Sequence, residues 1–144
     1  MKRNLIGTLS LVVLSVLISS TGAFAQAYAK ADVPFAFTVG SAQLPAGTYE
    51  VKTIGAGNSS IVIQNHETNA AAMSNAGHEQ PRNTRAKLVF HRVGNQYFLA
   101  EVWRSSTAEG IILPASRQEK DLAKELQLAK GPAGGYEEVV IALN

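Results

Sequence analysis

The sequence predicts a mainly β fold, an antiparallel sandwich or a partly open barrel with one C-terminal α-helix packed on it. Three observations lead to this prediction. Apolar and polar residues alternate along several short segments, turn-forming residues separate these segments, and a single stretch carries the start and stop signals of a helix. The 119 residues from Gln26 to Asn144 suffice for one domain.

The first 25 residues have the form of a secretory signal peptide. Lys2 and Arg3 give a basic start, an apolar run follows over Leu5–Ile18, and Ala23–Ala25 matches the small-x-small cleavage pattern. The run is shorter than the roughly 20 residues needed to cross a bilayer, although an uncleaved anchor is the alternative. The sequence therefore predicts an exported protein, periplasmic or extracellular, with no transmembrane segment after cleavage.

Composition excludes several kinds of chemistry. Cysteine is absent, which removes thiol catalysis, disulfide exchange and thiolate-metal sites. Cleavage would remove Lys2 and Arg3, so 11 of the 13 basic residues would face 11 acidic ones and the formal charge would be zero. A nucleic-acid binder needs a basic face, and the one basic cluster (Arg82, Arg85 and Lys87) is interleaved with polar residues. Nucleic acid is therefore not an expected partner.

The first half of the mature chain predicts strands separated by turns. In VPFAFTV, residues 33–39, large apolar residues alternate with smaller or polar ones, which predicts one strand. Pro34 cannot donate to a ladder, so this strand is expected at a sheet edge. A turn is expected at LPAG (44–47), and further strands are expected at TYEVKTI (48–54) and, after the GAGN turn, at SSIVIQ (59–64).

The region from Asn65 to Arg85 carries the weakest pattern. AAAMSNA, residues 70–76, is compatible with a strand, but its alanines are too small to decide. GHEQPRNTR, residues 77–85, is polar and contains proline, which predicts a loop. At the end of the chain, YEEVVIAL (136–143) predicts a last strand.

The stretch LVFHRVGNQYFLAEVW, Leu88–Trp103, predicts a β-hairpin. Gly94-Asn95 suits a two-residue type II′ turn, and the resulting register opposes Arg92 to Tyr97 and Leu88 to Glu101. One face would carry Val89, His91, Val93, Phe98, Ala100 and Val102, and the other would carry Leu88, Phe90, Leu99 and Trp103 together with Arg92 and Glu101. Both faces are largely apolar, so one is expected to meet the core and the other to be covered by the helix.

Residues 116–130 predict this helix. Ser116 and Glu119 form the pair of a capping box, and Gly131 is a stop signal. One narrow stripe carries Ala115, Leu122, Leu126 and Ala129. Leu128 lies off this stripe and is expected to pack on the following loop instead of being exposed.

Histidines are the main candidates for chemistry. His66, His78 and His91 do not have the spacing that places two imidazoles on one metal ion, so no metal or other cofactor is expected. A site assembled by the fold from His66 and His78 is the alternative. His91 lies between Val89 and Val93 and is expected to be half-buried and hydrogen-bonded. A Gly-x-Ser-x-Gly elbow is absent, and no catalytic residue is assigned.

Glu101 lies among apolar residues of the hairpin and would be costly to bury without a partner. Arg117, in the first turn of the helix, is expected to reach it and to fix the helix on the sheet through an Arg–carboxylate pair. Glu101 as a general acid or base would need a histidine or a second carboxylate nearby, and the predicted register places His91 on the opposite face.

Three segments resemble, in this order, a family of small exported bacterial proteins without an established activity. They are VPFAFTVGSAQLPAGTYEV (33–51), KLVFHRVGNQYFLAEVW (87–103) and LPASRQEKDLA (113–123). The corresponding family segments are VPFxFxVGxxxLPAGxYxV, LVFHRxGxxYFLxxVW and LPxSRxExELA, and the resemblance covers nearly all of the mature chain. It implies export, carries over no catalytic residues, and suggests a shared framework that includes His91, Trp103 and Arg117. We add Arg92 and Tyr97 as framework candidates.

A looser likeness concerns LPAGTYEV, residues 44–51, which is similar to a turn and strand of transthyretin-like and collagen-binding-type surface modules. The motif is short and widespread, so it supports a β-sandwich and no function.

Three functions stay open from the sequence. The first is a non-enzymatic exported module that binds an unidentified protein or envelope partner. The second is a carrier of a small apolar ligand in a β-barrel cavity, which an apolar cavity of about 300 Å³ or more would support. The third is an exported hydrolase that uses His91, His66 or His78 beside a carboxylate. The oligomeric state is not predicted.

Overall fold

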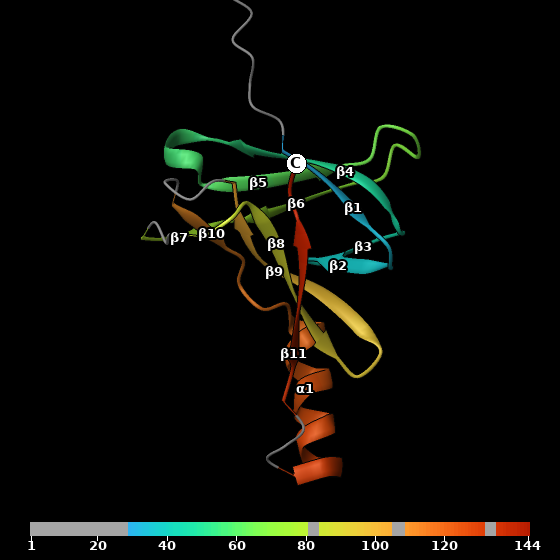
Figure 1. The fold of residues 1–144 in the computed structure, drawn as a ribbon. Helices are drawn as coiled ribbons and strands as arrows, with labels where there is room; N and C mark the ends of the chain where they lie inside the picture. The colour runs from blue at the N-terminus through green and yellow to red at the C-terminus, as the bar shows by residue number, and fades with distance from the viewer. Residues whose placement is uncertain (1–28, 81–83, 105–108, 132–134) are drawn as a thin grey trace, which may run out of the picture.

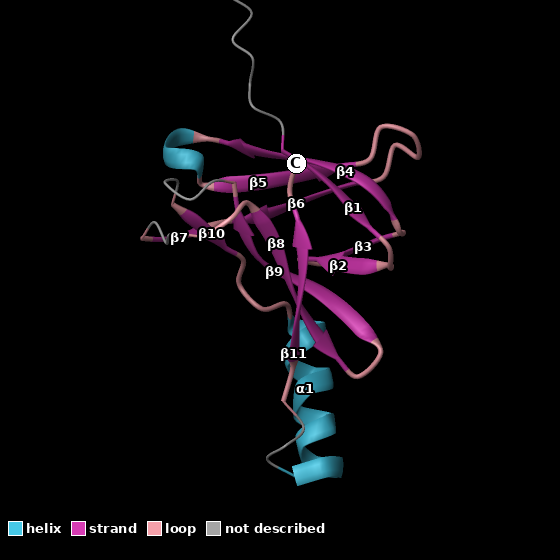
Figure 2. Ribbon diagram, in the orientation of Figure 1, coloured by secondary structure: helices cyan, strands magenta, loops and turns pink. Residues whose placement is uncertain are grey.

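Two β-sheets and one helix make up the part of the chain that the structure describes (Figures 1 and 2). A computed structural model describes residues 29–80, 84–104, 109–131 and 135–144, so the expected signal peptide, residues 1–25, lies outside the described residues. The elements in chain order are β1 (Ala29–Val33), β2 (Phe37–Val39), β3 (Ala42–Leu44), β4 (Gly47–Ile54), the 3₁₀ turn η1 (Ala56–Asn58), β5 (Ser60–Gln64), β6 (Ala71–Asn75), β7 (Gly77–Glu79), β8 (Lys87–Val93), β9 (Gln96–Trp103), β10 (Gly110–Ile112), α1 (Arg117–Lys130) and β11 (Glu137–Ala142).

The mainly β prediction with one C-terminal helix is confirmed, and the described strands are arranged as a sandwich instead of a closed barrel. The small sheet has the antiparallel order β1-β4-β5-β6. The large sheet has the antiparallel order β11-β8-β9-β10-β7. The hairpin of β2 and β3 joins it through a parallel contact between Thr38 of β2 and Phe98 of β9.

Side chains from both sheets fill the space between them. The ring of Phe37 meets that of Tyr49 edge-on with centroids 5.0 Å apart, and it meets that of Phe90 in the same way at 5.2 Å. Strand β4 shows the predicted alternation, because Tyr49 and Val51 are buried while the residues between and around them face outward. The interior is therefore occupied by the protein's own side chains.

Tyr49 allows the stability contribution of a buried hydroxyl in this interior to be tested. Its hydroxyl donates to the carbonyl oxygen of Pro45 at 2.6 Å, and burial raises the pKa of the phenol above 10.0 although a hydrogen bond with Asn65 opposes the shift. Tyr49→Phe is expected to lower the free energy of unfolding by about 1–2 kcal/mol, since the hydrogen bonds of the hydroxyl with Pro45 and Asn65 are lost. Because the folded pKa is raised, the contribution of Tyr49 is present below pH 10.0 and is lost as the pH rises further.

Urea unfolding of both proteins at neutral pH and above pH 10.0 checks this prediction. The difference in the free energy of unfolding between wild type and Tyr49→Phe should shrink at the higher pH. A difference that stays constant would contradict the raised pKa.

Two predictions in the first half of the chain are corrected. The single strand expected over residues 33–39 is interrupted, because β1 ends at Val33 in the small sheet while β2 begins at Phe37 in the large sheet. Pro34 lacks the N–H that would continue the ladder, and the chain crosses between the sheets there. The loop expected over residues 77–85 begins with β7, which pairs with β10, while residues 81–83 lie outside the described residues. The weak strand expected over 70–76 is confirmed as β6.

The hairpin of β8 and β9 forms as predicted around Gly94-Asn95, where Gly94 has a φ of 64°, but it contains a β-bulge. The predicted register holds as far as Phe90, and then Val89 pairs with Glu101 while Leu88 pairs with Val102. The extra residue on β9 moves Glu101 and Trp103 to the face of His91, and it moves Val102 into the core. The predicted assignment of Glu101, Val102 and Trp103 to the two faces of the hairpin is therefore wrong.

Helix α1 forms as predicted but covers the sheet less than expected. Ser116 caps it by accepting a hydrogen bond from the Glu119 backbone N–H at 3.1 Å, and Gly131 follows its last residue. Among the described helix residues only Glu119 is buried, and Figure 1 shows most of α1 extending away from the sheets. Leu128 is 80% exposed, so the expectation that it packs on the following loop is wrong. Within the described ranges, no helix has the length and apolar character needed to span a membrane.

Candidate functional site

His91 joins the hairpin to the helix. Its Nδ1 lies 2.8 Å from Oε1 of Glu119, and its ring stacks on that of Tyr136 with centroids 3.9 Å apart. The side chains of His91 and Glu119 are 19% and 9% exposed. His91 is thus half-buried and hydrogen-bonded, as its position on the strand led us to expect. We call His91, Glu119 and Tyr136 the α1 anchor.

The structure does not bring Glu101 and Arg117 together. Glu101 Oε2 accepts a hydrogen bond from Trp103 Nε1 at 2.7 Å. The Arg117 side chain is 96% exposed, and its Nε lies 3.9 Å from Oδ2 of Asp121 one turn along the helix. Position 117 faces solvent whereas position 119 faces the sheet, so Glu119 replaces Arg117 as the residue that fixes the helix. The sequence did contain a signal for this residue, because Glu119 was identified as half of a capping box.

Arg92 and Tyr97, the other framework candidates, tie the hairpin to its neighbours. Arg92 donates from Nε to the carbonyl oxygen of Gly94 at 3.2 Å, and its Nη1 lies 3.4 Å from Oε2 of Glu137. Its guanidinium carbon lies 5.8 Å from the centroid of the Tyr97 ring, which stacks on Phe35 at 3.9 Å. These contacts connect the hairpin to β11 and to the segment after β1, which is a structural role.

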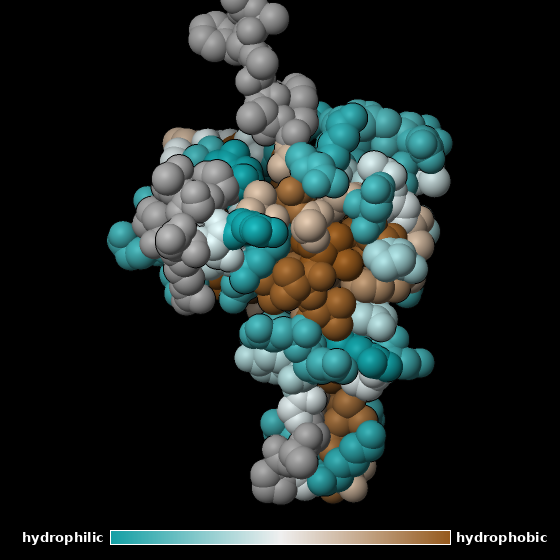
Figure 3. All heavy atoms as spheres, viewed as in Figure 1, coloured by the Kyte–Doolittle hydropathy of each residue, from teal (hydrophilic) through white to brown (hydrophobic). Residues whose placement is uncertain are grey.

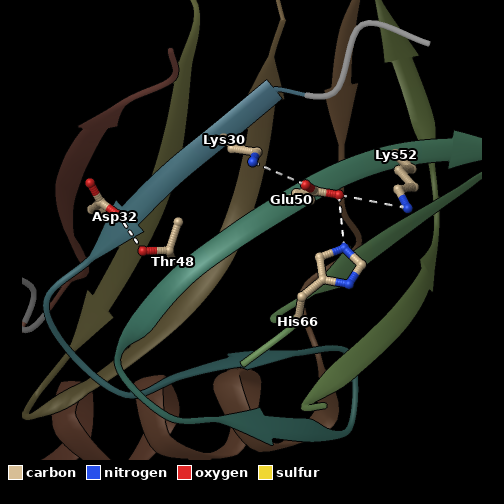
Figure 4. A network of polar contacts seen from close by, with 6 residues as sticks. All are labelled: Lys30, Asp32, Thr48, Glu50, Lys52 and His66. Carbon is tan, nitrogen blue, oxygen red and sulfur yellow. Dashed lines mark hydrogen bonds and ion pairs between the residues drawn. The ribbon is translucent and has the colours of Figure 1, made fainter. Parts of the chain in front are cut away.

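A second polar network lies on the outward face of the small sheet (Figure 4). Glu50 of β4 lies 3.3 Å from Lys30 Nζ on β1, 3.8 Å from Lys52 Nζ, and 2.9 Å from Nε2 of His66 in the segment after β5. A hollow of about 120 Å³ lies beside Glu50 and His66. This network was not predicted from the sequence, because its members come from three separate segments and only the strand register brings Lys30 opposite Glu50.

The Glu50 network predicts a pH dependence. The hydrogen bond from His66, more than the nearby Lys30, holds the pKa of the Glu50 carboxyl below its usual 4.5. A lowered folded pKa means that the contribution to stability is present above pH 4.5 and is lost as the pH falls through the folded value. Glu50→Gln is therefore expected to unfold at a lower temperature than wild type at pH 7, with a smaller difference at pH 3. Thermal unfolding followed by circular dichroism checks this, and Glu67→Gln, altering an exposed neighbour, is the control.

Each histidine of the chain contacts a carboxylate, since His78 Nδ1 also lies 3.5 Å from Oε2 of Glu109. A hydrolase could use an activated water or a side-chain hydroxyl as its nucleophile. The hydroxyl of Thr48, drawn on the same face in Figure 4, donates to Asp32 Oδ1 at 2.5 Å. Glu50 is also engaged by two lysines. Across the described ranges, no group of three or more His, Asp or Glu residues could hold a metal ion. Each of the three histidine–carboxylate contacts joins segments that are distant in the sequence.

A groove of about 700 Å³ lies along α1, opposite the turn between β2 and β3 and the hairpin residue Gln96. We call it the α1 groove. Its helix side carries side chains of both charges and two leucines, namely Arg117, Asp121, Lys124, Glu125, Leu122 and Leu128. The turn contributes Gly40 and Ser41. The groove thus offers apolar contact from two leucines and charged groups of both signs.

The structure therefore places His91, Arg92, Tyr97, Glu101 and Trp103 in contacts that connect parts of the fold and leaves Arg117 exposed. The α1 groove is the largest hollow described above. Its lining was not predicted, because Leu128 was expected to be covered. Comparison with protein-family models, with curated proteins and with solved structures finds no match to this chain.

Proposed function

We propose that this protein is an exported, non-enzymatic binding module whose α1 groove receives a segment of a protein partner in the cell envelope or outside the cell. The exposure of α1 is the observation that carries the proposal. The helix buries only Glu119 among its described residues, yet the α1 anchor holds its first turn on the sheet. A helix that adds so little to the core but is fixed in place is suited to present a surface to a partner.

The lining of the α1 groove favours a polypeptide as the partner. Its charged side chains include two basic and two acidic residues, so their formal charges cancel, and Leu122 and Leu128 supply apolar contact. Protein interfaces combine apolar anchors with a polar rim in this way. A nucleic acid would need an excess of basic residues instead. The partner segment is therefore expected to place apolar side chains on Leu122 and Leu128.

Export is supported by the basic and apolar start of the chain, by the small-x-small pattern at Ala23–Ala25, and by the resemblance to small exported bacterial proteins. Mass spectrometry of the protein recovered from its native cells tests this part. A mature N-terminus at Gln26 is expected, and an intact Met1 would contradict it.

Site-specific photo-crosslinking tests the groove. A photoreactive phenylalanine analogue at position 128 is expected to form one defined adduct in native cells, while the same analogue at Met73 should not. Met73 is the matched control because it is also an exposed large apolar residue, at 63% against 80% for Leu128, and lies on the small sheet. Purified partner should then bind the Leu128→Glu variant at least tenfold more weakly than wild type, with Met73→Glu unchanged. Equal crosslinking at both positions, or equal affinities, would reject the proposal.

A hydrolase is the second candidate, because His66 and Glu50 are hydrogen-bonded beside a hollow. Turnover of a generic ester or peptide substrate that His66→Ala abolishes would establish it. The carrier hypothesis has less support, since the space between the sheets is filled by side chains such as Phe37, Tyr49 and Phe90.

A further inference from the structure

Among the described residues, backbone hydrogen bonds join β1 to the chain that follows β11 at a single pair of residues. Lys30 and Asn144 exchange two backbone hydrogen bonds, of 3.0 and 2.9 Å, which join the small sheet to the large one just beyond the end of β11. Figure 1 shows the two strands diverging from this point, with β1 running to one side and β11 running away below the C-terminus. An edge of each sheet is therefore left open beyond the junction.

The hydrogen-bonded pair of Lys30 and Asn144 shows which way the backbone N–H and C=O groups of β1 and β11 point. In an antiparallel ladder, residues two apart direct their N–H and C=O groups to the same side. Lys30 and Asn144 face each other, so Asp32 of β1 and Glu138, Val140 and Ala142 of β11 face the gap between the strands. Leu143 bonds to Ala86 on the other side, which is consistent with this alternation. We call the backbone of Glu138, Val140 and Ala142 the open edge; across the described residues it has no backbone partner.

Apolar side chains lie along the open edge. Val140 is 52% exposed, and its neighbours Val139 and Ile141 are only partly buried against the core, as is Phe35 after β1. Figure 3 shows hydrophobic atoms gathered on this face below the C-terminus. An exposed apolar edge of this kind attracts a further strand, and native proteins usually protect such edges with charge, proline or a covering element. In β11 the charged residues are Glu137 and Glu138 at its start, and the last four residues of the strand carry neither charge nor proline.

We propose that the open edge binds an extended segment of a partner polypeptide, which adds a strand beside β11. The backbone of the segment would bond to Glu138, Val140 and Ala142, and its alternate apolar side chains would pack on Val139, Ile141 and Phe35. Acidic residues flank the site, with Asp32 on β1 and Glu137 and Glu138 at the start of β11, and Arg92 neutralises Glu137 alone. The segment therefore carries a basic residue at the end that meets Glu138. This surface is separate from the α1 groove.

A synthetic peptide tests the proposal. The probe is an acetylated and amidated ten-residue peptide of alternating valine and threonine with lysine at both ends, and a glutamate-ended peptide is its matched counterpart. Hydrogen exchange read by NMR is expected to slow at the amides of Glu138, Val140 and Ala142 when the lysine-ended peptide is added. Fluorescence anisotropy should give weaker binding for the glutamate-ended peptide.

Two variants of one residue separate backbone from side-chain effects. Val140→Pro removes the N–H that faces the gap and spares the bonds between β11 and β8, so binding should weaken at least tenfold. Val140→Ala keeps this N–H and should weaken binding less than threefold, and thermal unfolding shows whether both variants are folded. Equal binding by the two variants, or unchanged exchange at the three amides, would overturn the proposal. Dimerisation of the protein that Val140→Pro abolishes would assign the edge to a second copy and would also overturn it.

Discussion

Trp103→Ala is expected to lower the free energy of unfolding by about 3–5 kcal/mol, the range found when a large buried aromatic is truncated. The Trp103 side chain is 1% exposed, and its Nε1 donates to Glu101 at 2.7 Å. Truncation would leave a cavity and would also leave the Glu101 carboxylate without this donor. Urea unfolding monitored by circular dichroism measures the loss. It would amount to a large part of the total stability of a domain of this size.

Gly110 supplies the matched test of the Trp103 packing. A Cβ atom built at Gly110 would overlap three atoms of the indole ring, so Gly110→Ala is expected to cost about 1–3 kcal/mol by overpacking. In a Trp103→Ala background the same substitution should cost much less, because the methyl group would enter the cavity. Equal costs in the two backgrounds would show that Trp103 does not pack against Gly110.

The position of Trp103 also shows where prediction from sequence stopped. The hairpin, its turn and most of its register follow from alternating apolar residues around Gly94-Asn95. A β-bulge leaves no mark in that alternation, because both faces of this hairpin are apolar and either register buries large side chains. The face of Glu101 was therefore assigned incorrectly, and its partner with it.

Helix α1 shows a different limit of prediction from the sequence. Its bounds follow from local signals, namely the capping residue Ser116 and the stop at Gly131, and local signals do not depend on the rest of the fold. The contact of Glu119 with His91 joins residues 28 positions apart, and the stack on Tyr136 joins residues still further apart in the chain. Such contacts depend on how α1 and β11 lie against β8. The contacts of Glu50 with Lys30 and His66 also join separate segments of the chain. Neither the α1 anchor nor the Glu50 network could therefore be derived from the spacing of residues in the sequence.

Glu119→Ala is expected to loosen α1 and to lower the free energy of unfolding by about 1.5–3 kcal/mol, the range for hydrogen bonds that involve a charged group. Glu119 is the buried side chain of the helix and holds His91 at 2.8 Å, while its backbone N–H, which bonds to Ser116, is unaffected by the substitution. Isolated helices of this length are marginal in water, so loss of the contact should let α1 open locally. Hydrogen exchange of residues 117–130 should therefore accelerate more than exchange in β4 and β5.

Arg117→Ala is the control for this prediction, because it alters the same turn of the helix on its exposed side. With a side chain that is 96% exposed, Arg117 should contribute less than about 0.5 kcal/mol, and exchange in α1 should stay close to that of wild type. A double-mutant cycle of His91→Ala and Glu119→Ala should show that the two residues are coupled. Additive effects in this cycle, or equal losses for Glu119→Ala and Arg117→Ala, would mean that α1 is held by its leucines and not by the α1 anchor.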